Sequence, residues 1–399
     1  MKPSKIFSIS LQILLIVLLG GHLWAQSSIL HTDLQQIIPS DNLPKEVQTQ
    51  NANNNLDVYL WKGRYYVAFR TAPSHFASAK TKMYIISTTD FEEWAFELEI
   101  ALGSDVREPR FYAAEQQLFF MFFKGGKKRF KFEPQGIFQT SFDEKEWAPI
   151  QEITTIPLGY VPWRIKAYKG KYYLSSYEGI NEYKLKEACA LRLFVSDNGI
   201  DWLPISEQPQ LDHPRAIAEM AFDVDSKGDL WGIARLEFDG AYMMHAAAGQ
   251  WEKMEYWYSE YKFDSPYIFK HQGDFYLISR RNLSGKFARK PQRYKNNLID
   301  YSFRKKTTAL FRIDTSNHSL IHLHDFGTTG DCAFPSVQKT GENEYLLLDY
   351  SCAIDKGKKN WIRGQLGKTN IYWTKITFVK NNKPTIGQYK FVRPQGRFN

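Results

Sequence analysis

The chain has 399 residues, 43% of them hydrophobic and 16% aromatic, which is enough apolar surface for one or two sizeable cores. The formal net charge is +9; no nucleic-acid-binding motif accompanies the basic residues, so a nucleic-acid partner is not expected. The high aromatic content is typical of β-rich proteins that handle carbohydrate, although aromatic side chains also fill β cores.

Residues 1–25 have the pattern of a secretory signal. Lys2 and Lys5 give a positive start, residues 6–19 form an apolar run, and Ala25 precedes a plausible cleavage point at Gln26. No Cys follows the apolar run, so lipoprotein processing is not expected, and a retained membrane anchor is the alternative. No later stretch is long enough to span a bilayer. We therefore expect a secreted or periplasmic protein with no stable membrane insertion after cleavage.

From residue 56 onward one pattern recurs, after a polar segment (26–55) that we expect to be an irregular lead-in. Each unit runs as a strand, a turn, a second strand, a loop and a third strand, and often ends in Trp. The units cover residues 56–94, 106–147, 161–202, 213–251, 265–317 and 332–378. Repeats of roughly fifty residues dominated by strands are the signature of a β-propeller. The fold class expected is all-β, with residues 56–399 forming one six-bladed propeller; five blades is the alternative.

Three of the turns that close these units share an Asp followed by a Trp. They are Asp90 with Trp94, Asp143 with Trp147, and Asp197 with Trp202. An Asp side chain in such a turn accepts hydrogen bonds from backbone N–H groups, and the Trp packs between neighbouring blades. We expect these residues to be structural and assign them no chemistry.

The hairpin of residues 213–237 carries charge inside apolar strands. One strand is predicted over residues 216–223 and the other over 230–236, with a turn near Lys227. This pairing brings Glu219 beside Arg235 at one end of the hairpin. The pair is either a structural ion pair or an acid and an anion-binding arginine at the mouth of a pocket.

Other units place polar residues at the same end of their hairpins, where the loops of a propeller converge on its central channel. Charge at strand ends also serves solubility alone, but the recurrence favours a site. The candidate catalytic residues are Glu219, Glu108 and His75, and the candidate substrate-binding residues are Arg70, Arg107, Arg164, Arg235, Arg281, Trp163, Asp349 and Tyr350.

The 3 cysteines and the acidic residues give no sign of a metal site. Cys332 and Cys352 fall almost opposite each other in a predicted hairpin, so a disulfide between them is plausible, and Cys189 would then be a free core residue. We expect neither a metal nor a cofactor.

The Asp-Trp turns resemble degenerate Asp-boxes, and residues 56–378 resemble the sialidase (BNR-repeat) superfamily. The resemblance implies that Glu219 matches the Glu that polarises a Tyr nucleophile and that Arg235 matches the second arginine of a carboxylate-binding triad, with Arg280 or Arg281 as the third. Residues 330–338 resemble the segment that bears the Tyr. Phe334 stands at that position, so the standard Tyr nucleophile is not expected here.

The sequence therefore predicts an exported, sialidase-like glycoside hydrolase that acts on an acidic sugar at a chain end. A polysaccharide lyase acting on uronate, with His75 and Tyr350, is one alternative, and a non-catalytic glycan-binding propeller is another. Two basic runs, Lys124 to Lys131 and Lys286 to Lys306, are either solvated loops or attract an acidic polymer.

Overall fold

The computed structural model describes residues 27–185, 187–290, 293–357, 359–380 and 387–394. The predicted signal peptide lies outside this range. The described chain is almost entirely β-structure, as predicted, with the short helices α2 (Tyr294–Ser302) and α3 (Trp361–Gln365) and the 3₁₀ turns η1 (Gly179–Asn181) and η2 (Ile354–Lys356). No helix in these ranges is long and apolar enough to cross a membrane.

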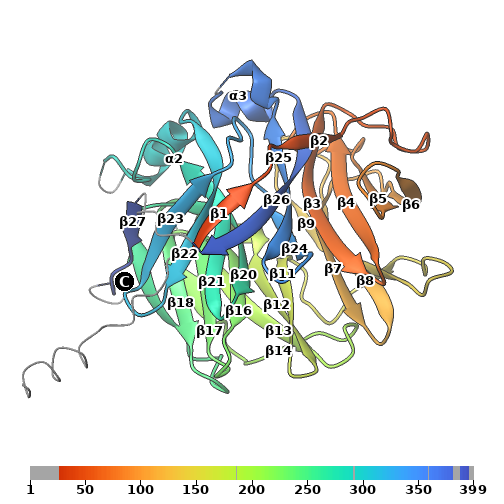
Figure 1. Ribbon diagram of the computed structural model, residues 1–399. Coiled ribbons are helices and arrows are strands. Elements are labelled where there is room, and N and C mark those ends of the chain that lie inside the picture. Colours follow the sequence, from red (N-terminus) through yellow and green to blue (C-terminus); the bar gives the residue numbers. More distant parts are fainter. Residues whose placement is uncertain (1–26, 186, 291–292, 358, 381–386, 395–399) are drawn as a thin grey trace, which may run out of the picture.

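The strands form antiparallel sheets that follow one another in chain order (Figure 1). One sheet holds β7 (Val106–Ala114), β8 (Gln117–Gly125), β9 (Pro134–Phe142) and β10 (Gln151–Glu152). The next holds β11 (Tyr160–Tyr168), β12 (Lys171–Glu178), β13 (Cys189–Ser196), β14 (Leu203–Pro204) and β15 (Leu211–His213). They are followed by β16 (Ile217–Val224), β17 (Leu230–Leu236), β18 (Ala241–Ala246) and β19 (Glu255–Ser259), and then by β20 (Phe263–His271), β21 (Asp274–Asn282), β22 (Lys306–Asp314), β23 (Ser319–Asp325) and β27 (Gly387–Lys390).

The remaining sheet has 9 strands and joins the two ends of the chain. Its antiparallel runs are β24 (Ser336–Lys339), β25 (Glu344–Cys352) and β26 (Thr369–Lys380), and β3 (Ala52–Trp61), β4 (Arg64–Ala72), β5 (Lys82–Thr88) and β6 (Ala95–Ile100). A single parallel pairing of Thr369 with Ala52 links the two runs. The first strands β3, β7, β11, β16, β20 and β24 contact each other in turn, and β24 contacts β3, so the sheets close into a ring.

Strand β8 shows why the sequence folds in this way. Its run Leu118 to Phe123 is apolar without alternation and is buried on both faces, because each sheet is packed between two neighbours. Phe120 and Phe122 join the core shared with β4 and β5, whereas Phe119 and Met121 join the core shared with β12 and β13.

The segment before residue 56 differs from the expected irregular lead-in. β1 (Ser27–His31) and β2 (Gln35–Ile38) pair with β26, and Figure 1 shows the orange-red β1 lying along the blue β26. Ile37 and Ile38 are buried in the central core. The hydrophobic alternation of this segment is weak. It pairs with β26 nevertheless, because a strand edge without a partner offers free backbone donors and acceptors.

Two of the three predicted Asp turns are confirmed. Asp90 accepts the N–H groups of Glu92 and Glu93 at 2.9 and 3.0 Å, and Asp143 makes the equivalent pair of bonds at 3.0 Å each. In the third turn the role falls to Asn198, which accepts the N–H groups of residues 200 and 201. Asp197 instead points outward and pairs with Lys171, so the prediction was wrong by one residue.

The proposed disulfide is also absent from the described structure. Cys189, Cys332 and Cys352 are all buried free thiols. Burial raises the pKa of the Cys332 thiol to about 12 and that of Cys352 to about 11, so both are protonated, apolar packing groups at neutral pH.

Candidate active site

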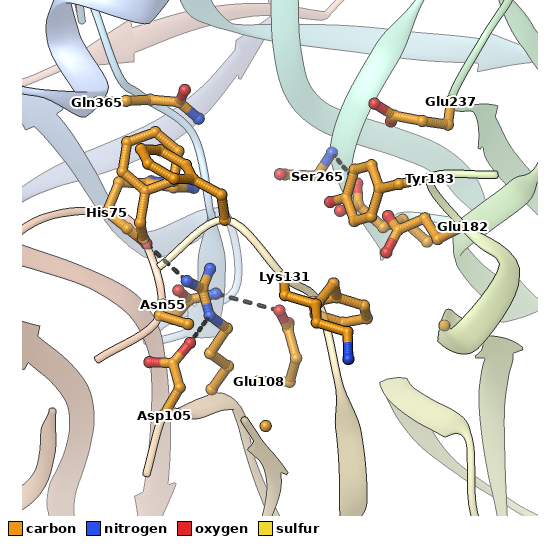
Figure 2. Close-up of a pocket in the computed structure, with 18 of the residues that line it drawn as sticks. Asn55, His75, Asp105, Glu108, Lys131, Glu182, Tyr183, Glu237, Ser265 and Gln365 are labelled. Carbon is orange, nitrogen blue, oxygen red and sulfur yellow. Dashed lines mark hydrogen bonds and ion pairs between the residues drawn. The ribbon is translucent and has the colours of Figure 1, made fainter. Parts of the chain in front are cut away.

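A cavity of about 580 Å³ lies where the first strands of the sheets meet. It opens at the end of the ring that carries α2 and α3, drawn at the top of Figure 1, and each helix contributes lining residues. Figure 2 shows its polar walls. His75 and Asp105 lie on one side, and Glu182 and Glu237 lie on the other.

Four first strands bulge at the level of this cavity. Asn55, Glu108, Glu219 and Ser265 have left-handed φ angles of 40, 52, 53 and 50°, and each coincides with a register shift in β3, β7, β16 or β20. A left-handed conformation is unfavourable for non-glycine residues, and bulges re-aim side chains. All four residues line the cavity, so the bulge repeated in these strands directs polar side chains into it.

Glu108 is a buried carboxyl group on the bulge of β7. It accepts a hydrogen bond from Asn55 Nδ2 at 3.2 Å and lies 3.2 Å from the Arg110 guanidinium. Burial raises the pKa of Glu108 to about 7; Arg110 opposes this rise, and the nearby Glu219 adds to it. A carboxyl group with this pKa exchanges a proton readily near neutral pH.

Glu219 and Arg235 lie side by side, as predicted, with 3.2 Å between Oε2 and Nε. The Ser265 N–H also donates to Glu219 Oε2 at 2.8 Å. Burial raises the pKa of Glu219, and Arg235 opposes the rise. Glu219 therefore has one hydrogen-bond donor, the Ser265 N–H, and one ion-pair partner, Arg235.

Arg235 contacts further carboxyl groups that surround it. Glu182 bonds to its Nη2, and Glu237 lies 3.1 Å from its Nη1. Although burial alone would lower the pKa of Arg235, Glu219, Glu237 and Glu182 hold it well above the ordinary value. Arg235 is thus an internal counter-ion rather than a free anion receptor.

Glu182 was not predicted from the sequence. It follows η1 in the loop after β12, is almost fully buried, and lines the cavity. Burial raises its pKa to about 8, against the opposing effect of Arg235, and its Oε2 has no hydrogen-bond partner among the described residues. No periodic or spacing signal marks a loop residue, so only the folded ring shows its proximity to Arg235.

His75 takes part in a chain of hydrogen bonds across the cavity wall. Its Nδ1 lies 2.7 Å from Asp331 Oδ2, and Tyr350 donates to Asp331 Oδ1 at 2.9 Å. Burial lowers the pKa of His75, with Asp331 opposing, so the imidazole is neutral at pH 7. Nδ1–H then donates to Asp331 and Nε2 is left as the acceptor.

Of the other predicted residues, Arg107 lines the cavity, and the rest have structural partners elsewhere. Arg107 bonds to Asp105 and to the His75 carbonyl. Arg70 is fully buried behind the wall and bonds to Asp105, Asn54 and the Phe76 carbonyl, which fixes the loop that carries His75. Arg281 pairs with Asp325 outside the cavity.

Three predicted residues remain, Trp163, Arg164 and Asp349, and they form the floor of the cavity or lie below it. The guanidinium groups of Arg110 and Arg164 lie 4.8 and 5.6 Å from the Phe334 ring, and Trp163 contacts the same ring. Asp349 accepts the Phe334 N–H at 2.7 Å. Beneath this layer a second cavity, of about 380 Å³, is lined by Arg110 and Arg164. Phe334 therefore lines the first cavity, and the two arginines that lie against its ring line the second.

The fold is similar to solved structures, although no family model and no curated protein matches the sequence. A protein of unknown function from Dyadobacter fermentans has a TM-score of 0.62 at 12% identity, over 88% of this chain and 100% of that one. Trypanosoma rangeli sialidase has a TM-score of 0.60 at 9% identity, over 87% of this chain and 59% of that one. An α-L-arabinanase of Penicillium chrysogenum has a TM-score of 0.54 at 10% identity, over 86% and 98%.

These likenesses show the fold. The chain has a sialidase-like β-propeller fold, as the sequence predicted, and it spans about three fifths of the sialidase (59%).

Proposed function

We propose that this protein is a glycoside hydrolase that cleaves a sugar from the end of a glycan. The observation that carries the proposal is the placement of Glu108 and Glu219, from β7 and β16, in one cavity. Most glycoside hydrolases use a pair of carboxyl groups that flank the glycosidic bond. The sialidase and arabinanase with the same fold, both named for activities on glycans, support the substrate class.

Glu108 is the proton donor in this proposal. Its pKa of about 7 leaves it partly protonated at neutral pH, so it can give its proton to the leaving oxygen as the glycosidic bond breaks. Glu219, which is paired with Arg235 and accepts the Ser265 N–H, acts in its carboxylate form and faces the anomeric carbon. It either takes a proton from the attacking water or attacks the carbon itself, and the anomer released distinguishes these routes.

The proposal extends to the blade count and to export. The 9-stranded sheet consists of two antiparallel runs joined by one residue pair, which supports six blades rather than five. Export rests on the signal-like residues 1–25.

The test is a screen of the chain from Gln26 against neutral and acidic glycans, with products identified by mass. The wild type should release a sugar with the mass gain of one water, and Glu108→Gln and Glu219→Gln should each lose at least about a hundredfold in kcat/KM. Glu152→Gln, at an exposed position of β10, is the matched control and should keep full activity. Binding without any product would make the protein a glycan-binding propeller.

A lyase is the second candidate, because His75 and Tyr350 line the same cavity and are linked through the buried Asp331. A lyase removes a proton beside a uronate carboxylate and leaves a C=C bond, so its products carry no added water and gain an ultraviolet absorbance. Such a product, lost in His75→Gln, would replace the hydrolase proposal.

A further inference from the structure

We propose that the mouth of this cavity binds the anionic chain of an acidic glycan, while the deep cavity accepts an uncharged terminal sugar. This inference rests on the proposed function and assigns its substrate class. The anionic groups are uronate carboxylates or sulfate esters, which share the chemistry that cationic side chains recognise.

Of the described residues that line the deep cavity, no arginine is free to bind an acidic sugar. Arg235 is surrounded by three glutamates, and Arg107 is paired with Asp105. Arg280 donates to the carbonyls of residues 332 and 333 and lies 3.5 Å from Asp264. A sugar carboxylate placed there would also face Glu108, Glu182 and Glu237. An acidic terminal sugar, the sequence prediction, therefore lacks a receptor in this geometry.

Unpaired positive charge gathers at the mouth instead. Arg129, Lys131 and Lys184 line the cavity and are exposed. Lys127 and Lys128 precede them on the same exposed loop, and no salt bridge between described residues involves Lys127, Lys128 or Arg129. Lys131 is the exception, because it pairs with Glu133 at 2.5 Å. This loop is the first basic run singled out in the sequence, and it lies at the cavity entrance.

The loop also carries a ring surface suited to a sugar. Phe130 is 79% exposed and packs edge-on against Phe76 at 5.1 Å, and the Arg129 guanidinium lies 5.2 and 5.6 Å from the two rings. Rings stack on the apolar face of a sugar while the neighbouring cations bind its anionic groups.

One helix of the second basic run also borders the cavity. Leu298 and Ser302 of α2 line it, and Arg293 and Lys295 are exposed at the start of that helix. A glycan whose end is held near Glu108 leaves through the entrance that the first basic loop lines. Exposed cations there raise both the association rate and the affinity for a polyanion, in a salt-dependent way.

The experiment measures binding by the Glu108→Gln protein, so that turnover does not interfere. Three oligosaccharides share one neutral terminal sugar and carry a neutral, a uronate or a sulfated chain. The triple variant K127A/R129A/K131A is compared with K169A/K253A/K339A, which removes the same charge from exposed lysines that do not line this cavity. Thermal unfolding of both variants verifies that they fold.

The mouth variant should bind the uronate or sulfated chain about tenfold more weakly at low salt, with a smaller loss at high salt, and the neutral chain unchanged. The control variant should match the parent protein. The acidic chain that the mouth variant binds more weakly identifies the anionic group. Equal loss in both variants, equal binding of all three chains or no binding would overturn the proposal, as would tighter binding of a chain that ends in an acidic sugar.

The proposed function fails by a different result. If the Glu108→Gln protein still hydrolyses the neutral-chain substrate at the wild-type rate, the assigned chemistry is wrong while the binding comparison stands.

Discussion

At the scale of the residue, burial decides which carboxyl groups can exchange protons. Glu108 and Glu219 are both buried on equivalent bulges, and burial raises the pKa of each. Glu219 is paired with Arg235 and accepts a backbone N–H. Glu108 has Arg110 and Asn55, and its pKa rises to about 7. Because general acids work best with a pKa near the working pH, Glu108 is the donor in this account.

The pH dependence of activity follows from this assignment. A proton donor is active in its protonated form, so kcat/KM should fall about tenfold per unit above about pH 7. The acid limb of the profile reports the ionisation of Glu219, which acts as a carboxylate. The measurement is kcat/KM between pH 5 and 9 on a substrate with no ionisable group. Glu152→Gln is the control and should show the same pH profile as the wild type. A rate that rises through pH 7 would mean that Glu108 acts as a base.

Arg235 is predicted to matter for stability because three buried glutamates share its single positive charge. Arg235→Gln should lower the free energy of unfolding by about 3–5 kcal/mol at pH 8. Without the guanidinium, the folded-state pKa values of Glu182 and Glu219 rise further above their unfolded values. The penalty is therefore present above the unfolded pKa of these groups and shrinks as the pH falls towards it.

Urea unfolding at pH 5 and pH 8 measures this effect. Arg281→Gln, which breaks one partly exposed pair with Asp325, is the control and should cost about 1 kcal/mol or less. Equal losses for the two variants, or a larger loss for Arg235→Gln at pH 5, would contradict the role of Arg235 as the shared counter-ion.

At the scale of the element, hairpins were predictable, whereas the residues that close them were less so. The strands around Glu219 and Arg235 follow the predicted ranges within a residue or two, because apolar runs and turn residues mark them. The third Asp turn was assigned to Asp197, but Asn198 accepts the N–H groups. Neighbouring Asx residues are equivalent in sequence, and only the backbone path separates them.

A pair of variants tests this correction. Asn198→Ala should destabilise the protein by about 1 kcal/mol, because two backbone N–H groups lose their acceptor. Asp197→Ala should cost less than about 0.5 kcal/mol, since its side chain is 78% exposed and pairs only with Lys171. Chemical denaturation compares the two, and a larger loss for Asp197→Ala would restore the original assignment.

At the scale of the whole molecule, the repeat predicted the ring, but the ring alone decides which residues meet. Glu108, Glu219, His75, Arg107, Arg235 and Tyr350 come together around one cavity. Trp163 and Arg164 lie in or under its floor instead, and Arg70 and Arg281 lie behind its walls or outside it. Successive side chains near a strand end point alternately into the channel and into the blade interior. The sequence position of a residue therefore indicates how far along the channel it lies, but not which way its side chain points.

The most direct test of the central claim is the mass of the product released from a glycan by wild-type protein and by Glu108→Gln and Glu219→Gln. The wild type should release a free terminal sugar with the mass gain of one water, and each variant should lose at least about a hundredfold in kcat/KM. An unsaturated product without added water, or full activity in either variant, would contradict it.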